Sequence, residues 1–164
     1  MIINILNVIN LRDINILDLI PQRPPFIAVD NLTYFDKLSA KTSFEITEDN
    51  IFCKDGIMEE TGLIENIAQT CAAHTSFLNI SHNNHTKLLK IAENIIPEQK
   101  FTDNKTGVIA MIDSLEISRS PLLGEILETT LTIEEEYFST TLVKSEIKIE
   151  NEIIAFCKMK LVLI

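Results

Sequence analysis

The hydrophobic and polar positions along the chain change their period, and this change separates strands from a long helix. Residues 39–47 alternate between apolar or small positions and polar ones, a period of two that is typical of a half-buried β-strand. The apolar stretch 26–35 is also predicted to be a strand. From about residue 58 to residue 79 the spacing becomes helical, with apolar residues on nearly every side. This segment predicts a helix that is buried on most of its surface.

Four β-rich segments are expected after this helix, at 106–117, 125–138, 140–150 and 152–163. The last three are joined by very short connections, which predicts an antiparallel meander. The order of two strands, a buried helix and several antiparallel strands favours the α+β class. One antiparallel sheet wrapped around a long central helix would bury the apolar surfaces of both. We expect a single domain over residues 1–164.

Shorter elements are expected around this framework. Residues 1–12 are predicted to form a short strand or arm, and residues 14–20 a short helix that Asp13 would cap through its side-chain oxygen. The tract 81–85 is polar and is expected to be a loop after the long helix. Residues 87–96 are predicted to form a second, amphipathic helix.

Composition and charge exclude several classes of protein. The chain has 164 residues, of which 46% are hydrophobic, with only 4 Gly and 5 Pro, so a disordered or collagen-like chain is excluded. The formal net charge of −10 argues against a general nucleic-acid binder, because the chain would repel a phosphate backbone. Three cysteines without a CxxC pair favour free thiols. With no basic leader and no apolar run of membrane-spanning length, we expect a cytoplasmic protein without a membrane span.

Three stretches carry a resemblance to a known family. They are NILDLIPQRPPFIAVD (15–30), LIENIAQTCAAHTSF (63–77) and the turn from Pro121 to Gly124-Glu125. In this order they resemble the P-H-R-x-P-F segment, the central helix and the P-x-x-G-D turn of FabZ-like 3-hydroxyacyl-acyl-carrier-protein dehydratases, over about residues 14–163. The resemblance implies a hot-dog fold. It also implies an acyl thioester on acyl carrier protein or coenzyme A as substrate, in fatty-acid or polyene-type biosynthesis, and no cofactor.

The same resemblance implies a dimer, either a homodimer or a heterodimer with a related hot-dog subunit, with active sites between protomers. In the family a histidine removes the proton next to the thioester, and a helix carboxylate of the other protomer protonates the departing hydroxyl. Glu65 matches that carboxylate. Gln69 lies four residues later on the same helix face, where it could orient Glu65 or contact substrate. Arg23, Phe26 and Gly62 are expected to bind substrate, with Gly62 nearest to the glycine whose N–H polarises the thioester carbonyl.

One departure from the family pattern changes the expected chemistry. Gln22 stands where the motif has histidine, and a glutamine cannot act as a general base. The family's G-H-F-P loop is also absent, since residues 53–58 read CKDGIM. We therefore expect a dehydratase-like lyase whose catalysis is altered, with Glu65 and Gln22 in its site and a base that a partner could supply. The alternatives are a hot-dog thioesterase that uses Glu65, or a non-catalytic acyl-binding subunit.

Other polar residues receive simpler interpretations. His74 lies nine residues after Glu65, on the opposite side of the helix, and is expected to be a core or interface histidine. His82 and His85 form an H-x-x-H pair, but two ligands without a third do not make a metal site, so none is expected. Arg119, together with Arg23, could form a local basic patch for an acidic carrier protein.

Overall fold

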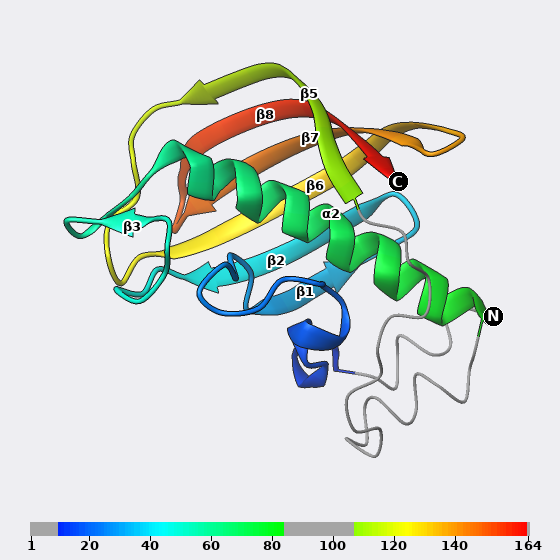
Figure 1. The fold of residues 1–164 in the computed structure, drawn as a ribbon, viewed down its shortest axis with the longest axis horizontal. Helices are drawn as coiled ribbons and strands as arrows, with labels where there is room; N and C mark the ends of the chain where they lie inside the picture. Colours follow the sequence, from blue (N-terminus) through cyan, green and yellow to red (C-terminus); the bar gives the residue numbers. More distant parts are fainter. Residues whose placement is uncertain (1–9, 84–106, 164) are drawn as a thin grey trace.

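The computed structural model describes residues 10–83 and 107–163, and its central element is helix α2 (Glu60–Asn83). A six-stranded antiparallel sheet curves around this helix, in the order β1-β2-β6-β7-β8-β5 (Figure 1). The strands are β1 (Asn31–Phe35), β2 (Ser39–Glu45), β5 (Gly107–Ile117), β6 (Ile126–Tyr137), β7 (Thr140–Ile149) and β8 (Glu152–Leu163). A small hairpin, β3 (Cys53–Lys54) with β4 (Ile57–Met58), precedes the helix. The α+β prediction of a sheet wrapped around one helix is confirmed.

The predicted meander is also confirmed, because β6 pairs with β7 and β7 with β8 in antiparallel register. Helix α2 runs to Asn83, so residues 81–83 are helical and do not belong to the loop expected at 81–85. The strand expected over 26–35 begins only at Asn31. The backbone groups of Phe26 and Ala28 instead bond to side chains of α2, and the Ile27 carbonyl accepts from Asn50, which leaves these groups unavailable for sheet pairing.

The N-terminal helix expected over residues 14–20 is not formed. Two 3₁₀ turns take its place, η1 (Leu11–Asp13) and η2 (Ile16–Asp18). The cause is local, because Asn15 accepts the Leu17 N–H (3.0 Å) through its side chain and so starts a second turn where a helix would have continued. Asn10, not Asp13, is the residue that caps the first turn. Residues 1–9 of the expected arm and the helix expected over 87–96 lie outside the described residues.

The interior contains two hydrophobic clusters. The first joins the beginning of α2 to β6, β7 and β8, and the second joins the later turns of α2 to β1, η2 and the segment before β1. Buried polar side chains lie on the helix and on the sheet that faces it, and they form a set that includes Thr42, Asn66, Gln69, Thr70 and Thr129. The N-terminal segment is therefore packed against α2 as part of the core and is not a loose extension.

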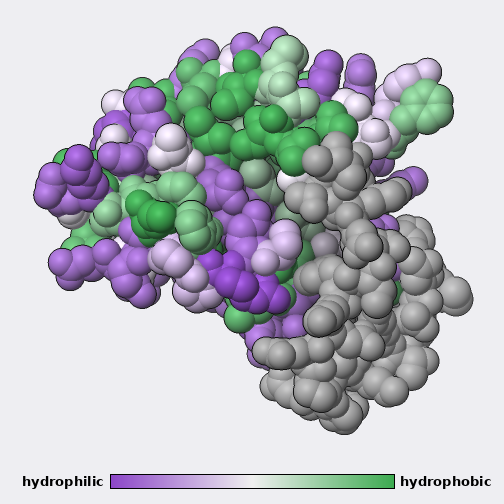
Figure 2. Space-filling view, in the orientation of Figure 1, coloured by the Kyte–Doolittle hydropathy of each residue, from purple (hydrophilic) through white to green (hydrophobic). Residues whose placement is uncertain are grey.

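The two edges of the sheet differ. Strand β1 has five residues and lies against η1, whereas β5 has eleven residues and, among the described strands, pairs with β8 alone. Figure 2 shows hydrophobic surface where β5 lies in Figure 1. Its exposed apolar residues are Val108 (36%), Ile109 (37%), Met111 (45%) and Ile112 (38%). Within the two described ranges, no helix combines the length and apolar character needed to cross a membrane.

Candidate functional site

The segment Pro21 to Ala28, called the strap below, passes over the first half of α2. Buried residues hold it at both ends: Leu19 and Ile20 precede it, and Ala28 and Val29 close it, all of them 0% exposed. Between these anchors the residues are exposed or half-buried. Two further bonds fix the strap from the loop before β3. The Ile51 N–H donates to the Pro25 carbonyl (3.2 Å), and Asn50 Nδ2 donates to the Ile27 carbonyl (2.6 Å).

Helix α2 contributes the side chains that meet the strap. Glu65 and Gln69 lie one helical turn apart on the same face, as their spacing predicted. Gln69 Nε2 donates to Glu65 Oε1 (2.8 Å) and to the Phe26 carbonyl (2.8 Å). The same amide accepts the Ala28 N–H at its Oε1 (2.8 Å). Gln69 is therefore a bridge that fixes both Glu65 and the strap backbone, which extends the orienting role expected for it.

Gln22 reaches Glu65 from the strap. Its Nε2 donates to Glu65 Oε1 at 3.1 Å, so two amide groups converge on the same carboxylate oxygen. Within the described part of the chain, Glu65 Oε2 takes part in no hydrogen bond, and the Gln22 Oε1 atom is buried without a partner. Because Oε1 is already occupied by two donors, Oε2 is the oxygen that can give or take a proton.

This cluster forms within one chain. The resemblance implied that the helix carboxylate acts across the interface between two protomers, whereas Gln22 and Glu65 of the same chain are in contact here. Of the three side chains that meet, only Glu65 can exchange a proton, since the two glutamines are neutral donors and acceptors. The cluster therefore contains one acid–base group and two groups that orient it.

Gly62 does not have the role expected from the family comparison. Its N–H donates to the Glu59 carbonyl (2.9 Å), so it is not free to polarise a thioester. The glycine is required by packing instead, because a Cβ at this position would lie 2.5 Å from Met58 Cε and 2.7 Å from Phe52 Cβ. Gly62 thus allows the first turn of α2 to approach the preceding hairpin closely.

Arg23 and Phe26 lie on the exposed side of the strap. Arg23 Nη1 donates to the carbonyls of Ile20 (2.9 Å) and Gln22 (2.7 Å), so its guanidinium closes back on its own backbone. The Phe26 residue is 49% exposed, while its carbonyl bonds to Gln69. Both residues are therefore adjacent to the cluster, and the side chain of Phe26 remains available for an apolar contact.

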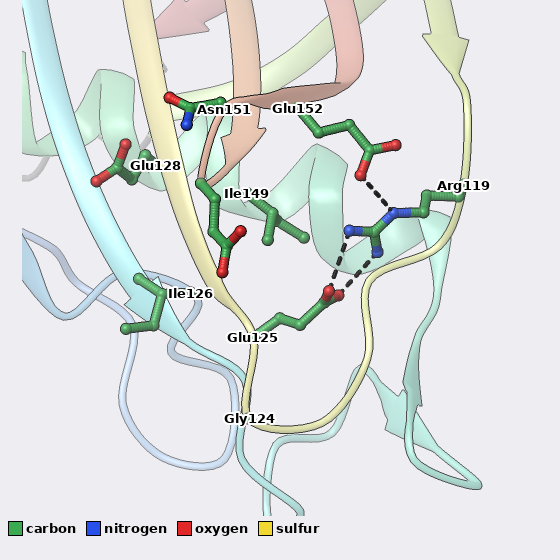
Figure 3. A pocket seen from close by; sticks show the side chains of 9 residues that line it. Arg119, Gly124, Glu125, Ile126, Glu128, Ile149, Asn151 and Glu152 are labelled. Atoms are coloured by element: carbon green, nitrogen blue, oxygen red, sulfur yellow. Dashed lines mark hydrogen bonds and ion pairs between the residues drawn. The ribbon is translucent and has the colours of Figure 1, made fainter.

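The basic patch expected from Arg119 is not formed, because this guanidinium is fully engaged by acids. It binds Glu125 through two nitrogens (2.8 and 3.0 Å) and Glu152 through Nε (3.0 Å). Figure 3 shows the three side chains in an open pocket, lined also by Gly124, Glu128 and Ile149. The hydrogen bonds from Arg119 lower the pKa of Glu125 below its ordinary value. This network braces the turn before β6 against the start of β8.

Further candidates from the sequence are structural. His74 is 0% exposed and packs on Phe35 with 5.0 Å between ring centroids, which confirms a core histidine. Desolvation raises the pKa of the Cys71 thiol to about 12, so this thiol is inert. No cluster of three or more His, Cys, Asp or Glu side chains suited to a metal occurs among the described residues. The His82 and His85 side chains lie outside that part.

Asn66 and Thr129 belong to the surroundings of the site but were not identified from the sequence. Asn66 is 0% exposed and its Nδ2 donates to the Ala28 carbonyl (2.7 Å), while the Thr129 hydroxyl donates to its Oδ1. A signal was present: Asn66, Gln69 and Thr70 repeat at helical spacing in an otherwise apolar segment. Such a polar stripe requires partners on the facing surface.

Comparison with known proteins bears on the same region. The model of the ApeP-like family, described as ApeP dehydratase, matches residues 14–89, a segment that contains the strap and α2. No curated protein matches the sequence.

Solved structures with the same architecture have very different sequences. The ApeI:P dehydratase heterocomplex of Xenorhabdus doucetiae is similar over 90% of each chain, with a TM-score of 0.71 and 10% identity. The PaaI protein of E. coli, from a phenylacetic acid degradation operon, has a TM-score of 0.54 and 12% identity over 80% of each chain. A hypothetical thioesterase of Streptococcus pneumoniae, solved with coenzyme A, has a TM-score of 0.54 and 8% identity, over 81% of this chain and 84% of that one. The fold is the hot-dog fold.

Proposed function

We propose that this chain is an acyl-thioester-binding subunit of the hot-dog dehydratase type, in which Glu65 is the proton donor. The observation that carries the proposal is that both hydrogen bonds to the Glu65 carboxyl group are made to the same oxygen. Gln22 and Gln69 hold Oε1, whereas Oε2 is left without a partner among the described residues. A carboxylic acid whose proton is confined to one accessible oxygen is suited to general acid catalysis at a fixed point. The family match over residues 14–89 supports a dehydratase-type substrate.

In the proposed reaction a 3-hydroxyacyl thioester loses water. A base removes the proton at C2, its electron pair forms the C2–C3 double bond, and the C3–O bond breaks. The leaving hydroxyl takes the proton from Glu65 Oε2 and departs as water. Glu65 is restored when the base returns its proton through solvent. The base is not Gln22, because a neutral amide does not accept a proton at physiological pH.

We propose that a second hot-dog subunit supplies the base. Strand β5 is a long edge with four exposed apolar residues at 36–45% exposure. In the described part of the chain no strand pairs with the outer side of β5. Such an edge offers backbone groups and apolar surface that favour pairing with another strand. One structural neighbour, ApeI:P, is a dehydratase heterocomplex, which supports a related but different subunit as the partner. We expect that subunit to carry the histidine that this chain lacks at position 22. A homodimer is the alternative that the experiment below distinguishes.

The experiment is a reconstitution. The purified chain is incubated with 3-hydroxyacyl and acyl thioesters of coenzyme A and of acyl carrier protein, first alone and then with a histidine-bearing hot-dog subunit. Enoyl thioester is measured at its ultraviolet absorbance and free thiol with a thiol reagent. We expect enoyl product only in the mixture, together with a heterodimer in size-exclusion chromatography. Enoyl product from the chain alone would contradict the need for a partner, and no enoyl product with any partner would reject the dehydratase assignment.

Hydrolysis is the second candidate, and one observation favours it. The cluster contains a single acid–base group, and one carboxylate is sufficient to activate water or to attack a thioester carbonyl directly. In that case the assay would release free thiol from acyl thioesters without a partner, and no enoyl product would form. The two readouts therefore separate the two reactions in one experiment.

A further inference from the structure

A buried polar network lies directly beneath the proposed acid. The face of α2 that turns toward the sheet carries Asn66 and Thr70, both 0% exposed. Thr42 of β2 and Thr129 of β6, each 1% exposed, face them from the sheet. Helix–sheet interfaces are ordinarily apolar, because burying polar groups has a free-energy cost unless every group is hydrogen-bonded. Here each of the four polar side chains makes at least one hydrogen bond.

The directions of these bonds follow from the chemistry of the groups. The Thr70 hydroxyl donates to the Asn66 carbonyl (2.8 Å), and a hydroxyl has only one hydrogen. In the 2.7 Å contact between the hydroxyls of Thr42 and Thr70, Thr42 must therefore be the donor. The Thr129 hydroxyl donates to Asn66 Oδ1, which leaves Asn66 Nδ2 to donate to the Ala28 carbonyl (2.7 Å). Thr129 thus fixes which way the Asn66 amide points.

The consequence for the site lies in the strap. Asn66 holds the Ala28 carbonyl, while Gln69 holds the Ala28 N–H and the Phe26 carbonyl. Three backbone groups of the strap, on Phe26 and Ala28, are thereby attached to Asn66 and Gln69, one and four residues after Glu65 on α2. The position of Gln22 relative to Glu65 depends on this attachment, because Gln22 lies four residues before Phe26.

Stability alone does not account for the network. Replacing hydrogen-bonded partners by apolar residues of similar shape is often neutral or stabilising, so a packed apolar interface would hold the sheet and helix together equally well. An apolar residue at Asn66 would, however, release the Ala28 carbonyl and the strap with it. The network is better explained by the precise placement of the strap.

We propose that Thr129 and Asn66 are positioning residues that set the contact between Gln22 and Glu65. This inference deepens the proposed function and rests on it for its relevance to catalysis. Its physical content, a coupling between a threonine of β6 and the amide groups around Glu65, does not depend on which reaction the site performs.

The test is Thr129→Val, which keeps the shape of the side chain but removes the donor. In ¹⁵N NMR spectra, Glu65→Gln should shift the side-chain amide signals of both Gln22 and Gln69, because both amides donate to Glu65 Oε1. This shift on replacing Glu65 is the response that is compared in the Thr129 backgrounds. We expect Thr129→Val to lose the response at Gln22, whereas Thr129→Ser, which keeps the hydroxyl, should retain it. Thr132→Val is the matched control, because Thr132 lies on the same strand with an exposed side chain. If Thr129→Val does not fold, Thr129→Ala is measured in its place.

An unchanged Gln22 response in a folded Thr129→Val or Thr129→Ala protein would overturn the inference. In the reconstituted enzyme the same variant should lower kcat about 10- to 100-fold with a smaller change in KM, because misplacing a reacting group affects the chemical step more than binding. An inactive wild type would reject the proposed function and leave the NMR result to decide the positioning role. A lost NMR response with unchanged kcat would reject the catalytic relevance alone.

Discussion

Helix α2 carries two polar side chains that are nine residues apart and have opposite surroundings. Glu65 is half-buried, is held by two side-chain amides and keeps one oxygen open. His74 is fully buried, packs on Phe35 of β1, and bonds through Nε2 to the backbone carbonyl of Asp36 (2.9 Å). The same helix thus carries a half-buried carboxyl group between two side-chain amides and a fully buried imidazole.

The difference lies in the type of partner as well as in burial. Glu65 is oriented by side chains on two separate segments, so its position depends on how the strap and the helix meet. His74 is fixed by backbone and by aromatic packing, and its Nδ1 atom is buried without a partner. A reactive role requires access for the substrate, and a structural role does not. The following predictions test this division of the helix, beginning with the largest expected effect.

Replacing Glu65 by Gln should remove activity and leave the fold intact. We expect a loss of about 10³-fold in the reconstituted reaction, since general acid catalysis contributes on the order of 10²–10⁴-fold. The amide has nearly the same shape as the carboxyl group, so thermal unfolding should change little. Steady-state kinetics and differential scanning calorimetry provide the two measurements. The control is Glu60→Gln, an exposed carboxyl in the first turn of the same helix. Comparable activity in the two variants would remove Glu65 from the mechanism.

Replacing His74 by Ala should have the opposite pattern. The substitution leaves a cavity beside Phe35 and Phe77, and we expect the free energy of unfolding to fall by about 3 kcal/mol. Urea denaturation at pH 7.5 measures the change, and Asn79→Ala, at an exposed position of the same helix, is the reference. At temperatures where the variant is folded, its turnover should stay within a few fold of the wild type. Selective loss of turnover with unchanged stability would place His74 in the site.

Restoring histidine at position 22 tests whether the strap can still carry a base. In Gln22→His the imidazole would start from a position that is already in contact with Glu65. Without a partner the wild type should form no enoyl product, and we expect the variant to dehydrate the substrate about tenfold faster than the uncatalysed background. The value is modest because one base without a complete site contributes little. Gln22→Ala serves as the control and should give no gain. An equal rate in both variants would indicate that the strap is too far from the substrate's C2 atom.

Most of the architecture could be predicted from periodicity, because the spacing of apolar residues within a strand or helix indicates which of its faces is buried. The meander and the central helix follow from such patterns within a few residues of their bounds. The N-terminal turns did not follow, since a helix over 14–20 and a pair of capped 3₁₀ turns have similar apolar spacing. The side chains of Asn10 and Asn15, which accept the backbone N–H groups of Arg12 and Leu17, distinguish them.

The sequence identified Gln22, Glu65 and Gln69, which the structure brings together, and an orienting role for Gln69, but not the way in which Gln22 reaches Glu65. The spacing of Glu65 and Gln69 places them on one face, whereas the contact of Gln22 with Glu65 depends on a strap held at its backbone by Gln69, Asn66 and Asn50. Such contacts join residues 23 to 43 positions apart and leave no periodic pattern. For the same reason the sequence could not show that the N–H of Gly62 is occupied or that Arg119 is bound to two acids.

The smallest predicted effect is the pH dependence of stability that arises from His74, the buried histidine of α2. Burial away from water lowers the pKa of His74 below its ordinary value. The hydrogen bond at the Asp36 carbonyl and the carboxylates of Glu136 and Asp36 act in the opposite direction but do not compensate. The unfolded chain then binds a proton near pH 6.5 that the folded chain does not yet bind. The free energy of unfolding should therefore fall as pH decreases below about 6.5, by at most about 1.4 kcal/mol per pH unit for one proton.

The hydrogen bonding of His74 also indicates that its pKa is lowered in the folded chain. Because Nε2 donates to the Asp36 carbonyl in the neutral ring, a second proton would have to reside on Nδ1, which is buried without an acceptor. The measurement is urea denaturation of the wild type and His74→Gln between pH 5 and 7.5. Subtracting one curve from the other removes the contribution of every other titrating group that the two proteins share. The difference should shrink as pH falls from 6.5, since only the wild type loses stability through His74. A constant difference over this range would mean that the ring accepts its proton equally well in the folded and unfolded chain. Burial of His74 would then not disfavour its charged form.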